Sequence, residues 1–214
     1  MKAILQAWSG YGLRMTEARR PLTDPKAMRA LAHPARLAIL NRLQAEGAAT
    51  ATEVAEVVGV TPSAASYHLR MLAKYGFAED APARGDGRER LWRSTRGGMT
   101  ITPEPDDRPE VRAAKDLLIK AVRDQAADEA TRALNNLDRE SREWREAAGF
   151  GCTVLLVDAE ELMTLRRRID ELLAPYSITA RDRAGAPAGV RISEAQVNLF
   201  PRVERRPHGL PGDG

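Results

Sequence analysis

Two short helical patterns that lie almost next to each other in the chain limit its fold more than any other feature. The first, TEVAEVVG, follows Thr50 and Thr52, which are candidate N-cap residues, and ends at Gly59. The second begins with Thr61 and Pro62 in the stretch VTPSAASYHLRMLAKYGF. Because so short a connection fixes the angle between two helices, the pair predicts a helix-turn-helix.

The second helix of this pair has two chemically different sides. Its apolar positions Ala65, Leu69 and Leu72 share one side of a 3.6-residue period and predict the buried face. The other side carries hydroxyls, one aromatic ring and two cations, with no acid among them: Ser63, Ser66, Tyr67, Arg70 and Lys74. A helix that enters the major groove of DNA needs such a face, because phosphates repel carboxylates and small donors can bond base edges. A surface helix without a partner is the plainer alternative.

Further elements on both sides of the pair complete a small domain. Asp24 before a proline predicts a short helix to about residue 32, and Pro34 begins another helix that ends at Gly47. After the pair, FAEDAPA and RERLWRST flank RGDG, whose glycines suit a hairpin tip. Three short helices followed by a β-hairpin predict a winged helix-turn-helix.

Basic residues gather in the same part of the chain. Residues 60–96 contain seven basic and four acidic side chains, so this segment carries a charge of +3, which is the net charge of the whole chain. A neutral body with one basic segment is the electrostatic footprint of a nucleic-acid-binding protein. Chance clustering on a solvated face is the alternative.

Three motifs in this order resemble the ArsR-type winged-helix transcriptional regulators: ALAHPARLAILNRL, EVAEVVGVTPSAASYHLRMLAKYGF and RGDGRERLWRS. The resemblance covers about residues 24–96. It implies a homodimer that represses promoters by binding inverted-repeat operators in double-stranded DNA, through a recognition helix at 61–76 and a wing at 77–95. Together with the helix face described above, it gives these candidate DNA-binding residues: Thr61, Ser63, Ser66, Tyr67, Arg70, Lys74, Arg84, Arg88 and Arg90.

The chain departs from the metal-sensing members of that family. The positions that match their Cys-x-Cys motif are Thr50 and Thr52, and no histidine lies between residues 108 and 148. We expect His33 to pack or to cap a helix, and His68 to be partly buried in the recognition helix. The sequence therefore predicts no metal site and no cofactor.

A long helical pattern follows a linker that is rich in glycine and proline. Over residues 108–148 its apolar positions fall into two phases, which predict two helices or one kinked helix. The period suits a pairing face, so we expect these helices to form the dimer. The resemblance to the ArsR-type regulators implies that the first helix, around Met28 and Leu31, joins the same interface. The two phases are Val111, Ala114, Leu118 and Ala121, and then Ala130, Leu134, Leu137 and Trp144.

The last third of the chain predicts a smaller module. CTVLLVD and VRISEAQVNLF are typical of strands, and AEELMTLRRRIDELLAPY between them is typical of an amphipathic helix. The predicted fold class is thus α+β, with an N-terminal winged helix-turn-helix, long dimerisation helices and a C-terminal strand-helix-strand module. The predicted boundaries are an extension (1–23), the winged helix-turn-helix (24–96), a linker (97–107), the dimerisation region (108–148), the α+β module (149–200) and a disordered tail (201–214).

Three features of this last region have two interpretations each. Cys152 precedes an apolar strand and is either a buried inert thiol or a redox sensor. The arginines at 166–168 lie among acids and form either a solvated helix face or an anion site. Trp144 and Phe150 contribute either to packing or to an effector pocket, and the sequence does not identify an effector.

The same sequence argues against other classes of protein. No run approaches the roughly 18 apolar residues of a membrane helix, no signal peptide is evident, and one cysteine allows no internal disulfide, so we expect a cytoplasmic protein without a membrane partner. Residues 97–214 contain no phosphate-binding loop or nucleophile elbow, which argues against an enzyme. The alternatives to a DNA-binding regulator are a winged-helix protein-interaction module and a regulator that responds to oxidation of Cys152.

Overall fold

The computed structural model of the protein describes residues 22–84, 89–95, 101, 104–178, 180–181 and 185–202. The chain forms two units, residues 1–148 and 149–214, which we describe separately. Most of the predicted N-terminal extension, the hairpin tip with Arg88, and most of the predicted tail lie outside the described residues. None of the described helices is long and apolar enough to cross a membrane.

The first unit begins with the helices that the capping signals predict. The carboxylate of Asp24 accepts a hydrogen bond from the backbone N–H of Lys26 at 2.8 Å, and Gly47 ends a later helix with φ 88°. Thr50 and Glu53 form a capping box in which each side chain accepts from the other backbone N–H. In chain order, the helices are α2 (Pro25–Leu31), α3 (Pro34–Glu46), α4 (Ala51–Val58) and α5 (Pro62–Lys74).

The wing contains one more strand than the sequence predicts. β2 (Ala78–Ala81) and β3 (Leu91–Ser94) are antiparallel, and β3 also pairs with the two-residue strand β1 (Ala49–Thr50). The sheet order is therefore β1-β3-β2. A strand of two residues is too short to show an alternating apolar pattern, so the sequence gives no sign of it. Its position is set by Gly47 before it and by the start of α4 after it. Through β1, the wing is joined directly to the start of α4.

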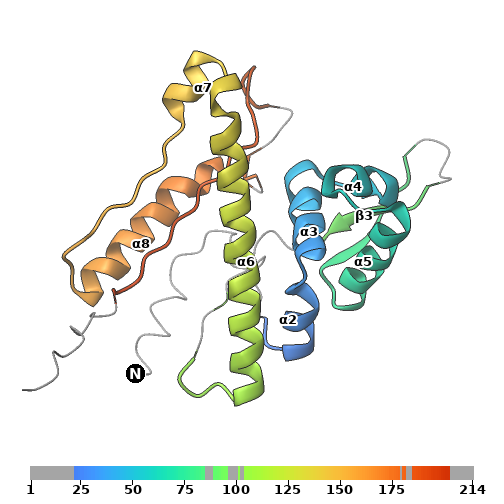
Figure 1. Ribbon diagram of the computed structural model, residues 1–214, viewed down its shortest axis with the longest axis horizontal. Helices are drawn as coiled ribbons and strands as arrows, with labels where there is room; N and C mark the ends of the chain where they lie inside the picture. Colours follow the sequence, from blue (N-terminus) through green and yellow to red (C-terminus); the bar gives the residue numbers. More distant parts are fainter. Residues whose placement is uncertain are drawn as a thin grey trace, which may run out of the picture. The chain divides into compact units, whose positions relative to one another are not determined.

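The long helix α6 (Pro109–Asn136) belongs to the core of the first unit. Val111, Ala114 and Leu118 are buried, and they join a hydrophobic cluster with Met28 and Leu31 of α2, both 0% exposed. Figure 1 shows α6 running alongside α2 and α3. The expectation that Leu118, Met28 and Leu31 face a second copy is therefore wrong, because their own chain already covers them.

The second apolar phase of this region begins within α6, at Ala130 and Leu134, and continues beyond the end of that helix to Trp144. After α6 the chain forms a 3₁₀ turn at Leu137–Arg139 and then α7 (Arg142–Ala147), so the region does contain two helices, but the break falls within the second phase and not at the change of phase. Here the apolar side chains are less covered: Leu134 is 55% exposed, and Trp144 is half-buried. The first half of α6 thus completes the core, while the second half leaves an uncovered face.

The second unit differs from the predicted strand-helix-strand module. Its described residues form α8 (Ala159–Leu173), which has an Asp158–Glu161 capping box, and a 3₁₀ turn at Ala174–Tyr176. The stretches 152–157 and 190–200 are not assigned as strands, so both strand predictions are wrong for this chain by itself. Apolar composition favours a strand, but a strand also needs a neighbouring strand, and the structure assigns neither stretch to a sheet.

Candidate nucleic-acid interface

The turn between α4 and α5 ends one helix and begins the next within three residues, Gly59 to Thr61. Gly59 ends α4 in the left-handed region at φ 72°, and the N–H groups of Gly59 and Val60 both donate to the carbonyl of Ala55. A side chain at Gly59 would be strained at this φ. Thr61 then caps α5, because its hydroxyl accepts from the N–H of Ala64 at 3.2 Å. The two helices are therefore joined by a short connection with both ends capped.

The two faces of α5 are separated as the sequence predicts. Ala65, His68, Leu69 and Leu72 are buried in the unit. The candidate DNA-binding residues of α5 and its cap lie on the opposite side, where Tyr67 is 51% exposed and no acid occurs between residues 61 and 74. Of these candidates, Ser66 is half-buried and the rest are exposed: Thr61, Ser63, Tyr67, Arg70 and Lys74.

The wing arginine Arg90 is held within the wing. Its Nη2 donates to Oδ2 of Asp80 at 2.9 Å, and its Nε contacts the other carboxylate oxygen. The guanidinium also lies over the ring of Trp92, 4.1 Å from the centroid. The hydrogen bond from Arg90 lowers the pKa of Asp80. Arg90 is thus aligned by an acid and an aromatic ring.

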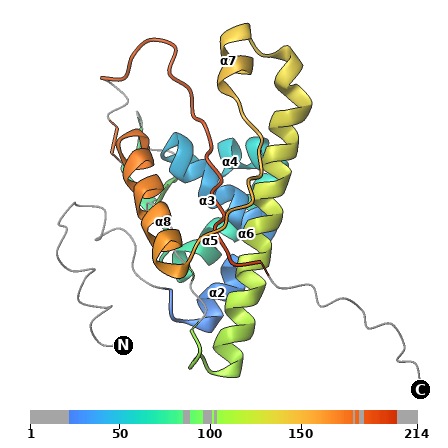
Figure 2. The same cartoon turned by 90° about the vertical axis from the view of Figure 1, so that its left-hand side faces the viewer.

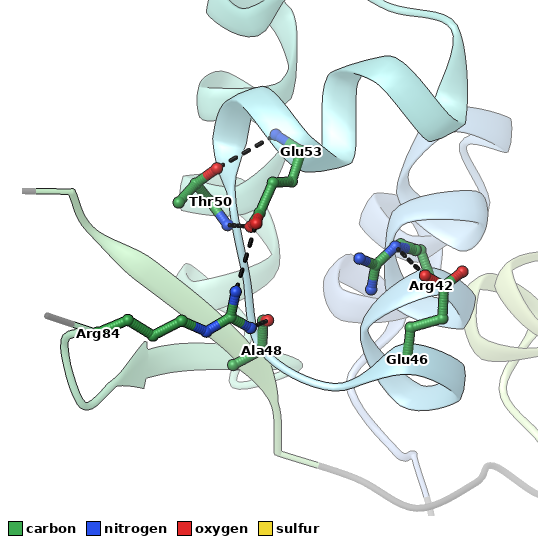
Figure 3. A network of polar contacts seen from close by, with 6 residues as sticks. All are labelled: Arg42, Glu46, Ala48, Thr50, Glu53 and Arg84. Atoms are coloured by element: carbon green, nitrogen blue, oxygen red, sulfur yellow. Dashed lines mark hydrogen bonds and ion pairs between the residues drawn. The ribbon is translucent and has the colours of Figure 1, made fainter.

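Arg84 is also held, by the beginning of α4 (Figure 3). Its Nη1 lies 3.3 Å from Oε1 of Glu53, and its Nη2 donates to the carbonyl of Ala48. The N–H of Thr50 donates to Glu53 at 2.7 Å and is the main cause of the lowered pKa of that carboxyl. Arg84 therefore ties the wing to α4, an intramolecular role that the sequence analysis missed.

A cleft lies between α5, the start of α4 and strand β3. Its volume is about 220 Å³. Two cations, Arg70 and Arg90, and one acid, Glu89, line it beside hydroxyl groups. At the start of α4 the capping box already binds the N–H groups of Thr50 and Glu53, so the N–H groups of Ala51 and Thr52 are the ones that could bind an anion at this end of the cleft. The full lining is Thr50, Ala51, Thr52, Ser66, Arg70, Glu89, Arg90 and Trp92. Thr50 and Thr52, considered above as metal positions, are here a helix cap and part of an anion-favouring cleft.

Two histidines and an arginine connect the buried side of α5 to the start of α3. The ring of His33 lies 4.8 Å from that of His68, and Nδ1 of His68 accepts from Nε of Arg36 at 3.5 Å. Nδ1 of His33 accepts from the N–H of Ala35 at 3.2 Å, which caps α3 as the sequence predicts. Burial is the main cause that lowers the pKa of both histidines, and Arg36 adds to it.

Acid is expected to destabilise the first unit through this cluster. Because the pKa of each histidine is lowered on folding, the unfolded chain binds more protons, and the free energy of unfolding falls as the pH drops below about 6.5. We expect a lower urea midpoint at pH 5.5 than at pH 7.5. His33→Asn keeps a capping acceptor that does not titrate, so it should weaken this pH dependence. An equal loss in parent and variant would contradict the assignment to His33.

The remaining sequence candidates belong to the second unit. Cys152 is exposed, so the interpretation as a buried thiol is wrong. Arg167 forms an exposed ion pair with Glu171 at 3.1 Å, which agrees with a solvated face for residues 166–168. Phe150 is 53% exposed. Among the described residues, no group of three or more histidine, cysteine or acidic side chains is placed to hold a metal ion.

Comparisons with known proteins support the helix-turn-helix. Residues 31–80 match a family model described as a helix-turn-helix domain. A double mutant of Lactococcus lactis ZitR in apo form is 18% identical, covering 68% of this chain and 83% of its own, with a TM-score of 0.31. A second structure of that mutant is 14% identical, covering 82% and 91%, with a TM-score of 0.30. These TM-scores are too low to establish a shared fold. No curated protein sequence matches the chain.

Proposed function

We propose that this protein is a dimeric, sequence-specific DNA-binding transcriptional repressor that binds an inverted-repeat operator through α5 and the wing. The observation that carries the proposal is the acid-free exposed face of α5 beside a cleft lined by Arg70 and Arg90. The match of residues 31–80 to a helix-turn-helix domain supports DNA binding. The proposal agrees with the ArsR-type resemblance and requires neither catalysis nor a cofactor.

In this proposal some side chains of the α5 face contact bases and others contact phosphates. Ser66 and Tyr67 lie in the middle of α5, where small donors and a ring can contact base edges in the major groove. Arg70 and Lys74 lie further along the same face and suit the phosphates on either side. A phosphate in the cleft would meet Arg70 and the N–H groups at the start of α4.

The wing arginines act from fixed positions in this proposal. Arg84 and Arg90 already have acidic partners, so binding a phosphate costs them part of an existing ion pair. Their contribution is therefore orientation of the wing as well as charge. Arg88, the third candidate, lies outside the described residues.

A second copy is proposed to bind along the later part of α6. Val122 and Leu134 are 37% and 55% exposed, and Ala126 and Ala130 between them follow at four-residue steps. Four-residue steps drift around a helix, so this stripe begins beside the core-covered face at Val122 and turns away from it toward Leu134. Two-fold pairing would place two recognition helices about one DNA turn, roughly 34 Å, apart.

The proposal includes no sensory metal. Thr50 is buried and is fully occupied in a capping box, and threonine is a poor ligand for the metals that cysteine-containing sites bind. Adding zinc is therefore expected not to release the protein from its DNA. Release of the DNA by micromolar zinc, reversed by a chelator, would contradict this part of the proposal.

Substitutions on α5 test the proposed recognition face. After an operator has been selected from randomised duplexes, Ser66→Ala and Tyr67→Ala should each weaken binding to it by about 1–3 kcal/mol if they remove a good base contact. Binding to unrelated DNA should change little. Val57→Ala, which removes an exposed side chain from α4, serves as a control for surface changes nearby. Unchanged operator affinity in both α5 variants would exclude this face from base recognition.

A further inference from the structure

The second unit leaves an unusual amount of apolar surface uncovered. None of its described residues is buried. Fourteen large apolar side chains between Phe150 and Phe200 are exposed at 37% to 102%. Together they expose on the order of 1,000 Å² of apolar surface, in a unit that buries none of its described side chains. Surface on this scale indicates that a partner covers it.

The stretch before α8 has the pattern of a strand without a neighbour. Val154 and Leu156 are 69% and 102% exposed, whereas Leu155 and Val157 are 42% and 40% exposed. This alternation has the period of two that distinguishes the faces of a strand. Figure 2 shows the chain entering α8 as an extended orange segment and returning as an extended red one. Both segments are extended and rich in apolar residues, yet neither belongs to a sheet.

Helix α8 adds a second apolar surface to the unit. Leu162, Leu165 and Ile169 recur at helical spacing and are only half-buried. One helix and two extended segments are too few to bury a core, because a stable sheet needs about three strands or a covering layer. Two such sets supply four strands and two helices, which is enough for a two-layer domain.

We propose that the C-terminal units of two copies combine, with the extended segments 152–157 and 190–200 of both copies forming one shared sheet under the two α8 helices. A second copy fits because a two-fold contact uses the same surface twice, so each copy supplies what the other lacks. The uncovered apolar area per copy exceeds the roughly 800 Å² that each partner buries in a typical stable interface.

Strand pairing would also provide backbone partners for the extended segment 152–157, which the structure does not assign to a sheet. An unpaired extended segment exposes N–H and C=O groups that readily pair with another strand. This inference builds on the proposed function in one respect. A dimer formed along α6 would hold the two C-terminal units at a high effective concentration.

Disulfide trapping in the full chain tests this sheet. Cys152 is the single native cysteine and lies at the start of the first segment, so a second cysteine can report its neighbours. We would introduce Val190→Cys, Ile192→Cys and Val197→Cys one at a time along the second segment. Arg168→Cys, on the charged side of α8, is the matched control. After mild oxidation, at least one variant on the second segment should form a covalent dimer in clear excess over the parent and the control.

Hydrogen exchange of the unoxidised parent gives an independent result. The backbone N–H groups of 152–157 and 190–200 should exchange at least tenfold more slowly than in an unfolded peptide. Leu156→Lys should abolish this protection while the N–H groups of α5 stay protected, which shows that the first unit remains folded. Fast exchange in the parent would overturn the proposal. So would a disulfide confined to single chains, because one chain would then complete its own sheet.

The outcomes separate this inference from the proposed function. If the variants cross-link between copies but the parent binds no operator, the shared sheet stands and the DNA-binding proposal fails. If the parent binds an operator as a dimer and no variant cross-links between copies, only the shared sheet is overturned.

Discussion

Leu118→Ala is expected to lower the free energy of unfolding of the first unit by about 2–5 kcal/mol, the usual cost of a leucine-to-alanine change in a core. Leu118 is 0% exposed and belongs to one hydrophobic cluster with Met28 and Leu31. Removing its isobutyl group leaves a cavity where α6 packs against α2. Urea unfolding followed by circular dichroism measures the change.

The matched control for this prediction lies on the same helix. Leu134 is 55% exposed in the single chain, so Leu134→Ala should cost far less when the protein is dilute enough to be a monomer. Equal losses in the two variants would show that α6 is not part of the core.

A chain cut after residue 96 should fail to fold as a smaller domain, because the cut removes Val111, Ala114 and Leu118 from the hydrophobic cluster.

The double substitution Ala130→Glu and Leu134→Glu is expected to disrupt the proposed α6 contact and to convert the dimer into monomers. Two carboxylates in an apolar interface would have no partner and would repel their copies across the two-fold axis. Operator affinity should fall by about 100-fold or more, because binding both half-sites together gains this much over binding one. Analytical ultracentrifugation and DNA titration measure the two effects.

A neighbouring position provides the control for the dimer prediction. Asn135 is exposed and points away from the stripe formed by Ala130 and Leu134, so Asn135→Glu adds the same charge outside the proposed contact. It should leave both mass and affinity unchanged. A dimer that survives the double substitution would place the contact elsewhere, and the C-terminal units would be the next place to look.

The helix-turn-helix could be predicted from the sequence because its signals are local. Thr50, Gly59, Thr61 and Pro62 each specify a cap or a turn through their own chemistry, and the structure has the helix boundaries that they predict. The period of apolar residues in α5 likewise gave the correct buried face. Local capping and amphipathicity therefore account for most of the first unit.

The errors arose where a structure depends on distant parts of the chain. The periodicity of α6 showed that Leu118 would be covered, but periodicity does not distinguish a cover from the same chain from a second copy. The family resemblance predicts that the wing arginines contact DNA, and it does not reveal that Asp80 and Glu53 hold Arg90 and Arg84 within the protein. The stretch 152–157 has strand composition, and among the described residues no strand pairs with it.

The salt dependence of operator binding, measured for the parent and for Arg70→Ala, tests the central claim most directly. If α5 lies in the major groove with Arg70 on a phosphate, the logarithm of the association constant should fall linearly with the logarithm of salt concentration. Arg70→Ala should bind more weakly to all sequences, with a slope shallower by about one for each Arg70 that contacts a phosphate. If the parent selects no operator from randomised duplexes, or if Arg70→Ala reproduces its affinity and slope, α5 is not the DNA-binding element of this protein.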